Sequence, residues 1–379
     1  MEKKTFEIEI KDKKTKARTG LLRTKSGEIE TPFFMPVATK TSVKHISSQD
    51  LEIIGAKAII SNSYILSLRP GTKVIKRFGG IAKFMNFSGI NFTDSGGFQM
   101  YSKEIYLDSD KNGVIFRNPF NGKKVSMTPE KNMEIQLKLN ADVAMCLDSM
   151  PLIEESKDSI RMAVEKTKLW ALRCKKHHDK MQKDVKREKR QLLFGIIQGG
   201  IHKDLREKSA KEIKKINFDG YAIGGLALGE PKKDEYKMIE ICKKIIPEEK
   251  IVYLMGAGEP LELLEAISRG VDIFDSRFPT QNARRGTLFT KKGRINLRNL
   301  KYKDDKCSID EKCNCFTCKN YSKAYIRHLL IEGEGLGMRL ASYHNLYFLQ
   351  KLIENAREAI YNEEFKKFLN NFKKSYHPN

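Results

Sequence analysis

Residues 270–290 read GVDIFDSRFPTQNARRGTLFT and place a carboxylate at the end of a predicted buried strand. The apolar side chains of Val271, Ile273 and Phe274 predict a short strand. It ends at Asp275, because Pro279 cannot continue the pairing. Three arginines follow directly: Arg277, Arg284 and Arg285. A carboxylate beside guanidinium groups suits a site that handles a polyanion, although an isolated Asp is as well explained as a helix cap, so the rest of the chain decides.

Seven further apolar segments have the same layout, each followed by Gly, Asp, Gln or Asn. Together they predict eight strands, at residues 31–38, 56–64, 91–94, 141–148, 192–198, 221–225, 251–255 and 271–275. Amphipathic segments between them predict helices at residues 47–54, 128–139, 154–176, 203–214, 233–245 and 259–268. This alternation is typical of a parallel sheet covered by helices.

The distribution of polar residues distinguishes two ways of arranging such a sheet. An open, doubly wound sheet concentrates its functional residues at a single switch point. Here polar groups follow many strands, which favours a (β/α)8 TIM-type barrel with its site at one rim. We therefore predict an α/β fold consisting of such a barrel and an inserted C-terminal zinc-binding subdomain.

Two segments outside the alternation predict additional β-structure. Residues 1–30 alternate weakly and predict an N-terminal β-hairpin at the edge of the barrel. Residues 101–127 carry turn sequences at 111–113 and 121–122 and predict a second hairpin over the rim. We expect residues 1–300 to form the barrel with both hairpins, and residues 301–379 to form the zinc-binding and C-terminal helical subdomain.

The composition points to a globular protein with a polyanionic partner. The 379 residues, 40% of them hydrophobic, suit one large domain with an appendage. Lys and Arg (71) exceed Asp and Glu (48) and give a net charge of +23, which favours binding to nucleic acid. The charged residues 175–190 are better explained as a solvated helix end or loop. The absence of a long apolar run and of a secretory signal predicts a cytoplasmic protein with no membrane contact.

Cysteine spacing predicts a metal site. The total of seven cysteines is odd and argues against a disulfide framework. Cys313, Cys315 and Cys318 lie within six residues, whereas Cys307 is out of register. His328 and His344 are both available as the fourth ligand. A helix over 318–330 carries His328 away, and a turn at 333–337 followed by a return helix brings His344 back, so we predict His344. Four protein ligands leave no open position, which predicts one structural Zn²⁺ per subunit.

The polar groups after the predicted strands suit a purine base. Asp94 opens the sequence DSGGFQ after the third strand, Asp148 ends the fourth, and Gln198 is followed by two glycines. Further glycines follow the sixth and seventh strands, at 224–225 and at 256 and 258. Carboxylates can accept from the N1–H and the exocyclic amine of guanine, and an amide or a backbone N–H can donate to its carbonyl oxygen.

Six motifs carry a resemblance to a known family. They are DSGGFQ (94–99), FGIIQGG (194–200), GGLALGE (224–230), YLMG (253–256), DIFDSRFPT (272–280) and the Cys-x-Cys-x2-Cys…His group. With them the chain closely resembles the bacterial-type tRNA-guanine transglycosylase (queuine tRNA-ribosyltransferase) family. The resemblance implies exchange of guanine at the wobble position of GUN-anticodon tRNAs (Asp, Asn, His, Tyr) for a 7-deazaguanine in queuosine biosynthesis, through a covalent ribosyl-enzyme. It also implies a homodimer.

The resemblance also implies roles for individual residues. Asp275 is expected to be the nucleophile and Asp94 the general acid/base. The residues expected to hold the base are Asp94, Ser95, Gly96, Gly97, Phe98, Asp148, Gln198, Gly225 and Leu226, with the ring of Phe98 stacking on it. The residues expected to contact RNA, in a U-G-U context, are Gly256, Ala257, Gly258, Glu259, Pro260, Leu261, Glu262, Thr280, Gln281, Asn282, Ala283 and Arg284.

The chain departs from the family pattern at several of these positions. Gln281 stands where bacterial relatives usually have Arg, which Arg277 or Arg285 would have to replace. Ser149 and Met150 stand where they usually have Glu-Cys. The bulky Leu228 favours a small substituent, so 7-aminomethyl-7-deazaguanine is the expected base.

Two alternatives accompany this expectation. The first is direct insertion of queuine by the same chemistry. The second is a non-catalytic RNA-binding partner subunit. Such a subunit would be expected to lose its nucleophile, whereas Asp275 and Asp94 are both present.

Overall fold

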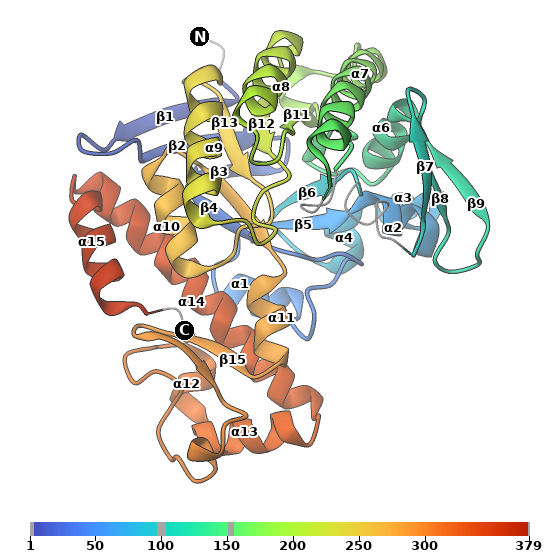
Figure 1. Cartoon of the computed structure of the whole chain (residues 1–379). Coiled ribbons are helices and arrows are strands. Elements are labelled where there is room, and N and C mark those ends of the chain that lie inside the picture. Colours follow the sequence, from blue (N-terminus) through green and yellow to red (C-terminus); the bar gives the residue numbers. More distant parts are fainter. Residues whose placement is uncertain (1–3, 97–103, 151–154, 378–379) are drawn as a thin grey trace.

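A ring of eight parallel strands forms the centre of the computed structural model, which describes residues 4–96, 104–150 and 155–377 (Figure 1). The strands are β4 (Phe33–Pro36), β5 (Ala58–Asn62), β6 (Ile90–Asp94), β10 (Val143–Met145), β11 (Leu192–Ile197), β12 (Gly220–Ile223), β13 (Ile251–Leu254) and β14 (Ile273–Ser276). They are paired in the order β4-β14-β13-β12-β11-β10-β6-β5. A parallel bridge between Val37 and Ile60, with a 2.7 Å hydrogen bond from the N–H of Ala38 to the carbonyl of Ile60, joins the two ends. The predicted barrel is confirmed over the open sheet.

Aromatic side chains fill the interior of the barrel. The ring of Phe92 on β6 packs edge-on against Phe33, Phe194 and Tyr253, with centroids 6.1, 6.0 and 6.4 Å away. These residues come from strands on different sides of the ring, so the interior is a packed core rather than a pore. Bases and side chains can therefore meet only at the rim.

Helices alternate with the strands, as the amphipathic segments predict. They are α1 (Ser48–Ile53), α2 (Ser63–Leu66), α3 (Thr72–Arg77), α4 (Ile81–Met85), α6 (Pro129–Lys138), α7 (Lys157–Met181), α8 (Lys203–Ile216), α9 (Lys232–Ile245) and α10 (Pro260–Ser268). Short helical turns occupy Ser67–Gly71 and Arg187–Lys189. Side-chain caps set the starts: Thr128 accepts from the N–H of Lys131, and Ser156 from that of Ser159. Because Ser156 caps it, α7 begins at Lys157 rather than at the predicted residue 154. It ends at Met181, beyond the predicted end at residue 176.

Both predicted hairpins have a third strand, so the two-stranded predictions were incomplete. The N-terminal sheet contains β1 (Phe6–Lys11), β2 (Arg18–Thr24) and β3 (Gly27–Thr31). The rim sheet contains β7 (Tyr106–Asp110), β8 (Gly113–Arg117) and β9 (Lys124–Met127). In the rim sheet the chain turns at residues 121–122 and returns, so that Val125 pairs with the buried Phe116. Residues 101–103 of this predicted segment lie outside the described residues.

The region predicted to bind zinc is inserted between the last barrel strand and a long helix. After β14 come α11 (Phe278–Arg284), β15 (Thr287–Thr290), β16 (Gly293–Asn296), the turn Leu300–Tyr302, α12 (Phe316–Asn320), α13 (Lys323–Ile331), α14 (Gly335–Tyr361) and α15 (Phe365–Ser375). Helix α14 spans both regions (Figure 1). Its Leu340 belongs to a second hydrophobic cluster with Leu288 and Ile326, whereas Leu346 and Ile353 pack into the barrel core. The second cluster draws on both sides of residue 300, and the division there stays a prediction.

None of the helices in the described parts of the chain has the length and apolar character to span a membrane.

A buried ion pair ties the N-terminal sheet to the end of the barrel where the strands begin. Arg18 donates to both oxygens of Asp272, at 2.8 and 2.6 Å, and to the carbonyls of Glu248 and Lys250. The side chains of Arg18 and Asp272 are 4% and 0% exposed. Removing one partner would leave a buried charge without compensation.

We expect Arg18→Met to lower the free energy of unfolding by about 3–5 kcal/mol, because Asp272 then remains charged and buried. Trp170, the only tryptophan of the chain and fully buried, reports unfolding in urea by its fluorescence. Adding Asp272→Asn should restore part of the loss. An unchanged urea midpoint for the single variant would contradict this account.

Candidate functional site

Asp94 stands at the end of β6, where it receives two hydrogen bonds. The strand register places it beside Asn62, the last residue of β5. Its Oδ1 accepts from the N–H of Gly96 at 2.9 Å, and its Oδ2 accepts from Nδ2 of Asn62 at 3.4 Å. Gly96 has φ +81°, and an added Cβ would lie 2.3 Å from Cβ of Tyr64, so glycine is required for this turn. Gly97 and Phe98, the next predicted site residues, lie outside the described residues.

Asp148 and Gln198 form a fully buried pair beside Asp94. Oδ1 of Asp148 accepts from the hydroxyl of Ser95 at 3.0 Å, and its Oδ2 accepts from Nε2 of Gln198 at 2.7 Å. The bond from Nε2 orients the side-chain amide of Gln198, so that its Oε1 points away from Asp148. That oxygen is buried and has no hydrogen-bond partner among residues 4–96, 104–150 and 155–377. A buried acceptor without a donor indicates a place for a ligand N–H.

Two consecutive glycines leave room for the amide of Gln198. A Cβ on Gly224 would lie 2.8 Å from its Nε2, and one on Gly225 would lie 2.5 Å from its Oε1. A cavity of about 240 Å³ opens here; its lining residues are Glu155, Lys157, Ile160, Gln198, Gly200, Ile201, His202, Gly225, Leu228 and Glu230. The predicted Leu226 is buried beside it. The carboxylate of Glu230 accepts from the N–H groups of Ala227 and Leu228 and holds this loop.

The residues that depart from the family pattern lie in different parts of the structure. Leu228 lines the cavity. Ser149 and Met150 are buried, and the N–H of Ser149 donates to the hydroxyl of Thr167 at 3.0 Å. Gln281 is partly exposed on α11.

Asp275, at the end of β14, is held through one of its two oxygens. Oδ1 accepts from the hydroxyl of Tyr253 at 2.5 Å and from the N–H of Gly256 at 3.0 Å. Oδ2 has no hydrogen-bond partner in the described part of the chain and is not among its fully buried atoms. The carboxylate is therefore fixed in position through Oδ1, while no described residue bonds to Oδ2.

Sequence reasoning missed the role of Tyr253. It appeared only as a letter of the YLMG motif, because an aromatic residue in the buried strand IVYL looks like core. The signal was the polar end of the ring, since a buried tyrosine hydroxyl needs a partner. Its partner lies on β14, the neighbouring strand of the barrel.

The three carboxyl groups affect one another electrostatically. Burial raises the pKa of Asp94 to about 8, and the charges of Asp275 and Asp148 add to this effect. Burial also raises the pKa of Asp148 and of Asp275, while hydrogen bonds from Gln198 and Ser95, and from Tyr253 and Gly256, oppose it. Asp94 is therefore protonated at neutral pH beside two more acidic partners, an arrangement typical of an acid/base group.

The predicted RNA-contact residues divide into accessible and buried ones. Ala257, Gly258, Pro260, Glu262, Thr280 and Ala283 are buried. Gly256, Glu259, Leu261, Gln281, Asn282 and Arg284 are at least partly exposed. Glu259 and Glu262 form a capping box at the start of α10, which gives both a local structural role. The contacts with RNA stay a prediction.

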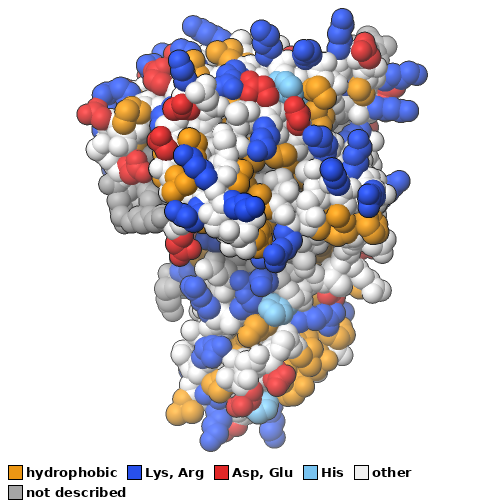
Figure 2. Space-filling view, turned by 90° about the vertical axis from the view of Figure 1, so that its right-hand side faces the viewer, with side chains coloured by type: hydrophobic (Ala, Val, Ile, Leu, Met, Phe, Trp, Pro, Cys, Tyr) orange, Lys and Arg blue, Asp and Glu red, His pale blue; other side chains and the backbone are white. Residues whose placement is uncertain are grey.

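A basic cluster lies on and next to α11, the helix that follows Asp275 in the chain. Burial and the charges of Arg285 and Arg277 lower the pKa of Arg284, and burial and the charges of Arg284 and Lys44 lower that of His45. Lys and Arg side chains also gather where the molecule narrows toward the C-terminal region (Figure 2). A surface with several such cations attracts anions.

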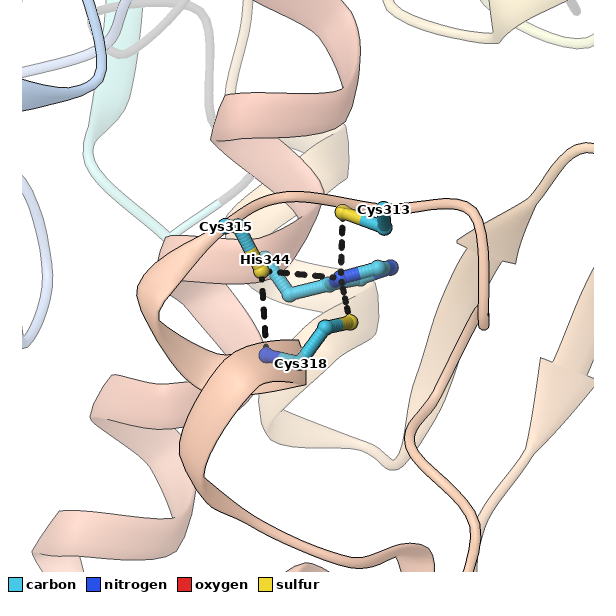
Figure 3. A group of neighbouring side chains, drawn as sticks. All are labelled: Cys313, Cys315, Cys318 and His344. Atoms are coloured by element: carbon cyan, nitrogen blue, oxygen red, sulfur yellow. Dashed lines mark hydrogen bonds between the residues drawn. The ribbon is translucent and has the colours of Figure 1, made fainter.

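The three predicted cysteines and His344 converge on one point (Figure 3). Nδ1 of His344 lies 3.8, 3.5 and 3.3 Å from the sulfurs of Cys313, Cys315 and Cys318. The Nε2–H donates to the carbonyl of Phe289 at 2.7 Å, which leaves Nδ1 free to bind a metal. His328 and Cys307 are not part of this group. Three thiols and one imidazole fit a tetrahedral metal ion with no open position, and the imidazole that lies at the three sulfurs is that of the predicted His344.

Comparison with known proteins identifies the family. A family model described as queuine tRNA-ribosyltransferase matches residues 12–378. A queuine tRNA-ribosyltransferase of Fusobacterium nucleatum is 46% identical over 374 residues, covering 98% of this chain and 98% of that protein. The chain belongs to the queuine tRNA-ribosyltransferase family. Proteins of that name from Staphylococcus aureus (46% over 364 residues, 96% and 94% covered) and Caldanaerobacter subterraneus (46% over 374 residues, 99% and 98%) agree.

As a queuine tRNA-ribosyltransferase family member, the chain is an enzyme of the pentosyltransferase class. The sequence-based resemblance is thus confirmed at the level of the family. The metal cluster and the carboxylates at the barrel rim all lie within the matched residues.

The titration of Asp94 predicts a pH-dependent stability. An unfolded Asp titrates near pH ~4, whereas the folded pKa is about 8, so the folded chain alone keeps the proton between these values and loses stability as pH rises. We therefore expect the urea midpoint of Asp94→Asn minus that of wild type to increase between about pH 4 and pH 8, because only wild type loses this contribution to stability. Above about pH 8 the difference should stay constant. Asp158→Asn, at an exposed position, is the control. A pH-independent difference would refute the raised pKa.

The metal cluster predicts one bound ion per chain. We expect elemental analysis of the purified protein to find one zinc, and Cys315→Ser to lower both the zinc content and the melting temperature, because a structural ion contributes to folding. Cys307→Ser is the matched control, since Cys307 is exposed and outside the cluster. Equal zinc content in both variants would argue against the site.

Proposed function

We propose that this chain exchanges guanine at the wobble position of GUN-anticodon tRNAs (Asp, Asn, His, Tyr) for a 7-deazaguanine in queuosine biosynthesis, through a covalent ribosyl-enzyme. The observation that carries the proposal is the carboxylate of Asp275, which has one oxygen held by Tyr253 and Gly256 and the other without a hydrogen-bond partner among the described residues. A carboxylate oriented in this way beside a protonated acid is the arrangement of a retaining glycosyl transfer.

In this mechanism, Oδ2 of Asp275 bonds to C1′ of the ribose while the C1′–N9 bond breaks and its electron pair leaves on guanine. Asp94 supplies the proton that the departing base takes up. It then accepts the N9 proton of the incoming base, whose nitrogen displaces Asp275 from C1′. The pKa of Asp94, about 8, supports both steps, because the group holds a proton at neutral pH and releases it readily.

The base is held between Asp148, Gln198 and the loop of Gly225. The buried Oε1 of Gln198 needs a donor, and the carboxylate of Asp148 accepts from N–H groups. Ser95, Gly96 and Gly97 complete this wall in the proposal, Leu226 closes the opposite side, and Phe98 stacks on the ring. Leu228 in the cavity wall favours 7-aminomethyl-7-deazaguanine over the larger queuine.

The RNA lies over the basic cluster of Arg277, Arg284 and Arg285 in this proposal. Their position on and next to α11, the helix that follows Asp275, and the net charge of +23 support a phosphate backbone there. The wobble nucleotide is splayed out of its loop to reach the pocket. The two uridines that flank it in the U-G-U context then lie on α11 and on the segment 256–262. Arg277 or Arg285 replaces the Arg that relatives carry at Gln281.

The metal, the oligomer and the location complete the proposal. The ion at Cys313, Cys315, Cys318 and His344 is a structural Zn²⁺, which fits a thiol-rich tetrahedral donor set. The enzyme is a homodimer located in the cytoplasm. Exposed apolar side chains on α12, α13 and the start of α14 support a second copy there: Phe316, Tyr325, Ile331 and Leu336.

The decisive experiment compares wild type and Asp275→Ala with radiolabelled guanine, 7-aminomethyl-7-deazaguanine and queuine on a GUN-anticodon tRNA. We expect wild type to incorporate the aminomethyl base best and Asp275→Ala to lose at least about a thousandfold in rate, as loss of a nucleophile does. Asp158→Ala, at an exposed position, should keep the activity.

Each other outcome has a definite meaning. Preferential use of queuine would establish the direct-insertion alternative. If wild type binds tRNA and exchanges none of the three bases, the chain is an RNA-binding partner subunit. Full activity of Asp275→Ala would overturn the covalent mechanism.

A further inference from the structure

Arg206 on α8 is a completely buried cation with unusual partners. Its Nη1 donates to the carbonyls of Ile197 and Gly224 at 2.9 and 2.8 Å, and its Nε and Nη2 donate to the carbonyl of Gly200 at 3.2 and 2.6 Å. Its exposure is 0%, and no carboxylate in the described parts of the chain forms an ion pair with it. Burying a guanidinium without a carboxylate partner costs free energy. The hydrogen bonds to the three carbonyls offset part of this cost.

The three carbonyls belong to the two loops that form the base pocket. Those of Ile197 and Gly200 flank Gln198, and that of Gly224 precedes Gly225. The guanidinium of Arg206 thus links the end of β11 and the loop after it to the loop after β12. Gly200 and Gly225 also line the cavity with Gln198.

The same helix holds Gln198 a second time. Ser209, three residues along α8 from Arg206 and on the same face, accepts the N–H of Gln198 at 3.0 Å. The approach of helix and loop is close, since a Cβ on Gly199 would lie 2.7 Å from the backbone nitrogen of Arg206. The backbone of Gln198 is therefore fixed by α8, while its side chain is oriented by Asp148.

The pocket tolerates little movement between its two loops. Oε1 of Gln198 lies so near Gly225 that an added Cβ would approach it to 2.5 Å. A shift of one loop against the other would change the spacing between the amide and the N–H groups of the Gly225 loop, and base recognition depends on this spacing.

We propose that Arg206 is a positioning residue for base recognition: its guanidinium sets the distance and angle between Gln198 and the Gly225 loop. The inference rests on the proposed function of this pocket. A lysine cannot replace it, because an ammonium is a single point of donation, whereas the guanidinium reaches three carbonyls in one plane. Arg206 does not touch the base, and its effect is on affinity rather than on the chemical step.

The test compares Arg206→Lys with Arg18→Lys. Both residues are buried arginines that bind backbone carbonyls, but Arg18 lies where the barrel strands begin. We expect Arg206→Lys to raise KM for guanine about tenfold or more, with kcat and KM for tRNA little changed. Arg18→Lys should lower the melting temperature and leave KM for guanine unchanged. A purely structural role of Arg206 would give both variants the same pattern.

Two further measurements keep the proposal testable if Arg206→Lys does not fold. Ser209→Ala removes the second support of Gln198 and should raise KM for guanine several-fold. In Arg206→Ala, added guanidinium at millimolar concentration should restore part of the affinity, whereas ethylammonium should not. A wild-type KM for guanine in folded Arg206→Lys, or in Ser209→Ala if the lysine variant does not fold, would overturn the inference.

Direct binding of guanine, measured by calorimetry without tRNA, separates this inference from the proposed function. If wild type binds guanine and exchanges none, the exchange reaction fails while the positioning role is still decided by the variants' affinities. If wild type neither binds nor exchanges guanine, both fail.

Discussion

Closure of the sheet between β4 and β5 is the constraint from which the site follows. It brings the carboxyl ends of eight parallel strands around one mouth, while the aromatic rings around Phe92 fill the interior behind it. Polar groups at the strand ends then have mainly one another as partners. Asp148 takes its hydrogen bonds from Ser95 and Gln198, and Asp275 takes its own from Tyr253 and Gly256. Burial raises the pKa of Asp94 to about 8, and the charges of Asp275 and Asp148 add to this effect, so Asp94 holds its proton to a higher pH.

The group of Cys313, Cys315, Cys318 and His344 is connected to the mouth of the barrel through α14. His344 faces the three sulfurs, and the next residue, Asn345, donates to the carbonyls of Pro279 and Thr287 and accepts from the N–H of Phe289. Pro279 lies at the start of α11, directly after β14. The cluster therefore braces the helix that carries Arg284, and its contribution is to the shape of the basic surface at α11 rather than to the chemistry.

The sequence was most informative where a residue's role depends on its own neighbours in the chain. Apolar runs gave the strands, and polar residues just after them gave Asp94, Asp148, Gln198 and Asp275. The choice of His344 over His328 needed only the direction of two helices, and the structure places His344 at the three cysteines. Tyr253 and Arg206 were beyond this reasoning for opposite reasons. The tyrosine sits in an apolar strand and looks like core, whereas the arginine sits in the charged segment KDLREKSAKEIKKI and looks like surface. The function of each depends on a partner from another strand or loop, which periodicity does not predict.

The two buried arginines, Arg18 and Arg206, lie at opposite ends of the barrel and form hydrogen bonds with different kinds of group. Arg18, at the end where the strands begin, is neutralised by Asp272, and the two charges act in opposite directions on the pKa of Lys243, which burial lowers to about 8. At the mouth, Arg206 has no carboxylate within ion-pair distance in the described part of the chain, and the charge of Glu230 acts on it only at longer range. Its hydrogen-bond partners are neutral carbonyls at the end of β11 and in the loops that follow β11 and β12. Arg18 thus holds its end of the barrel largely through a charge pair, whereas Arg206 acts on the backbone geometry of two loops, which is what the proposed positioning of the pocket requires.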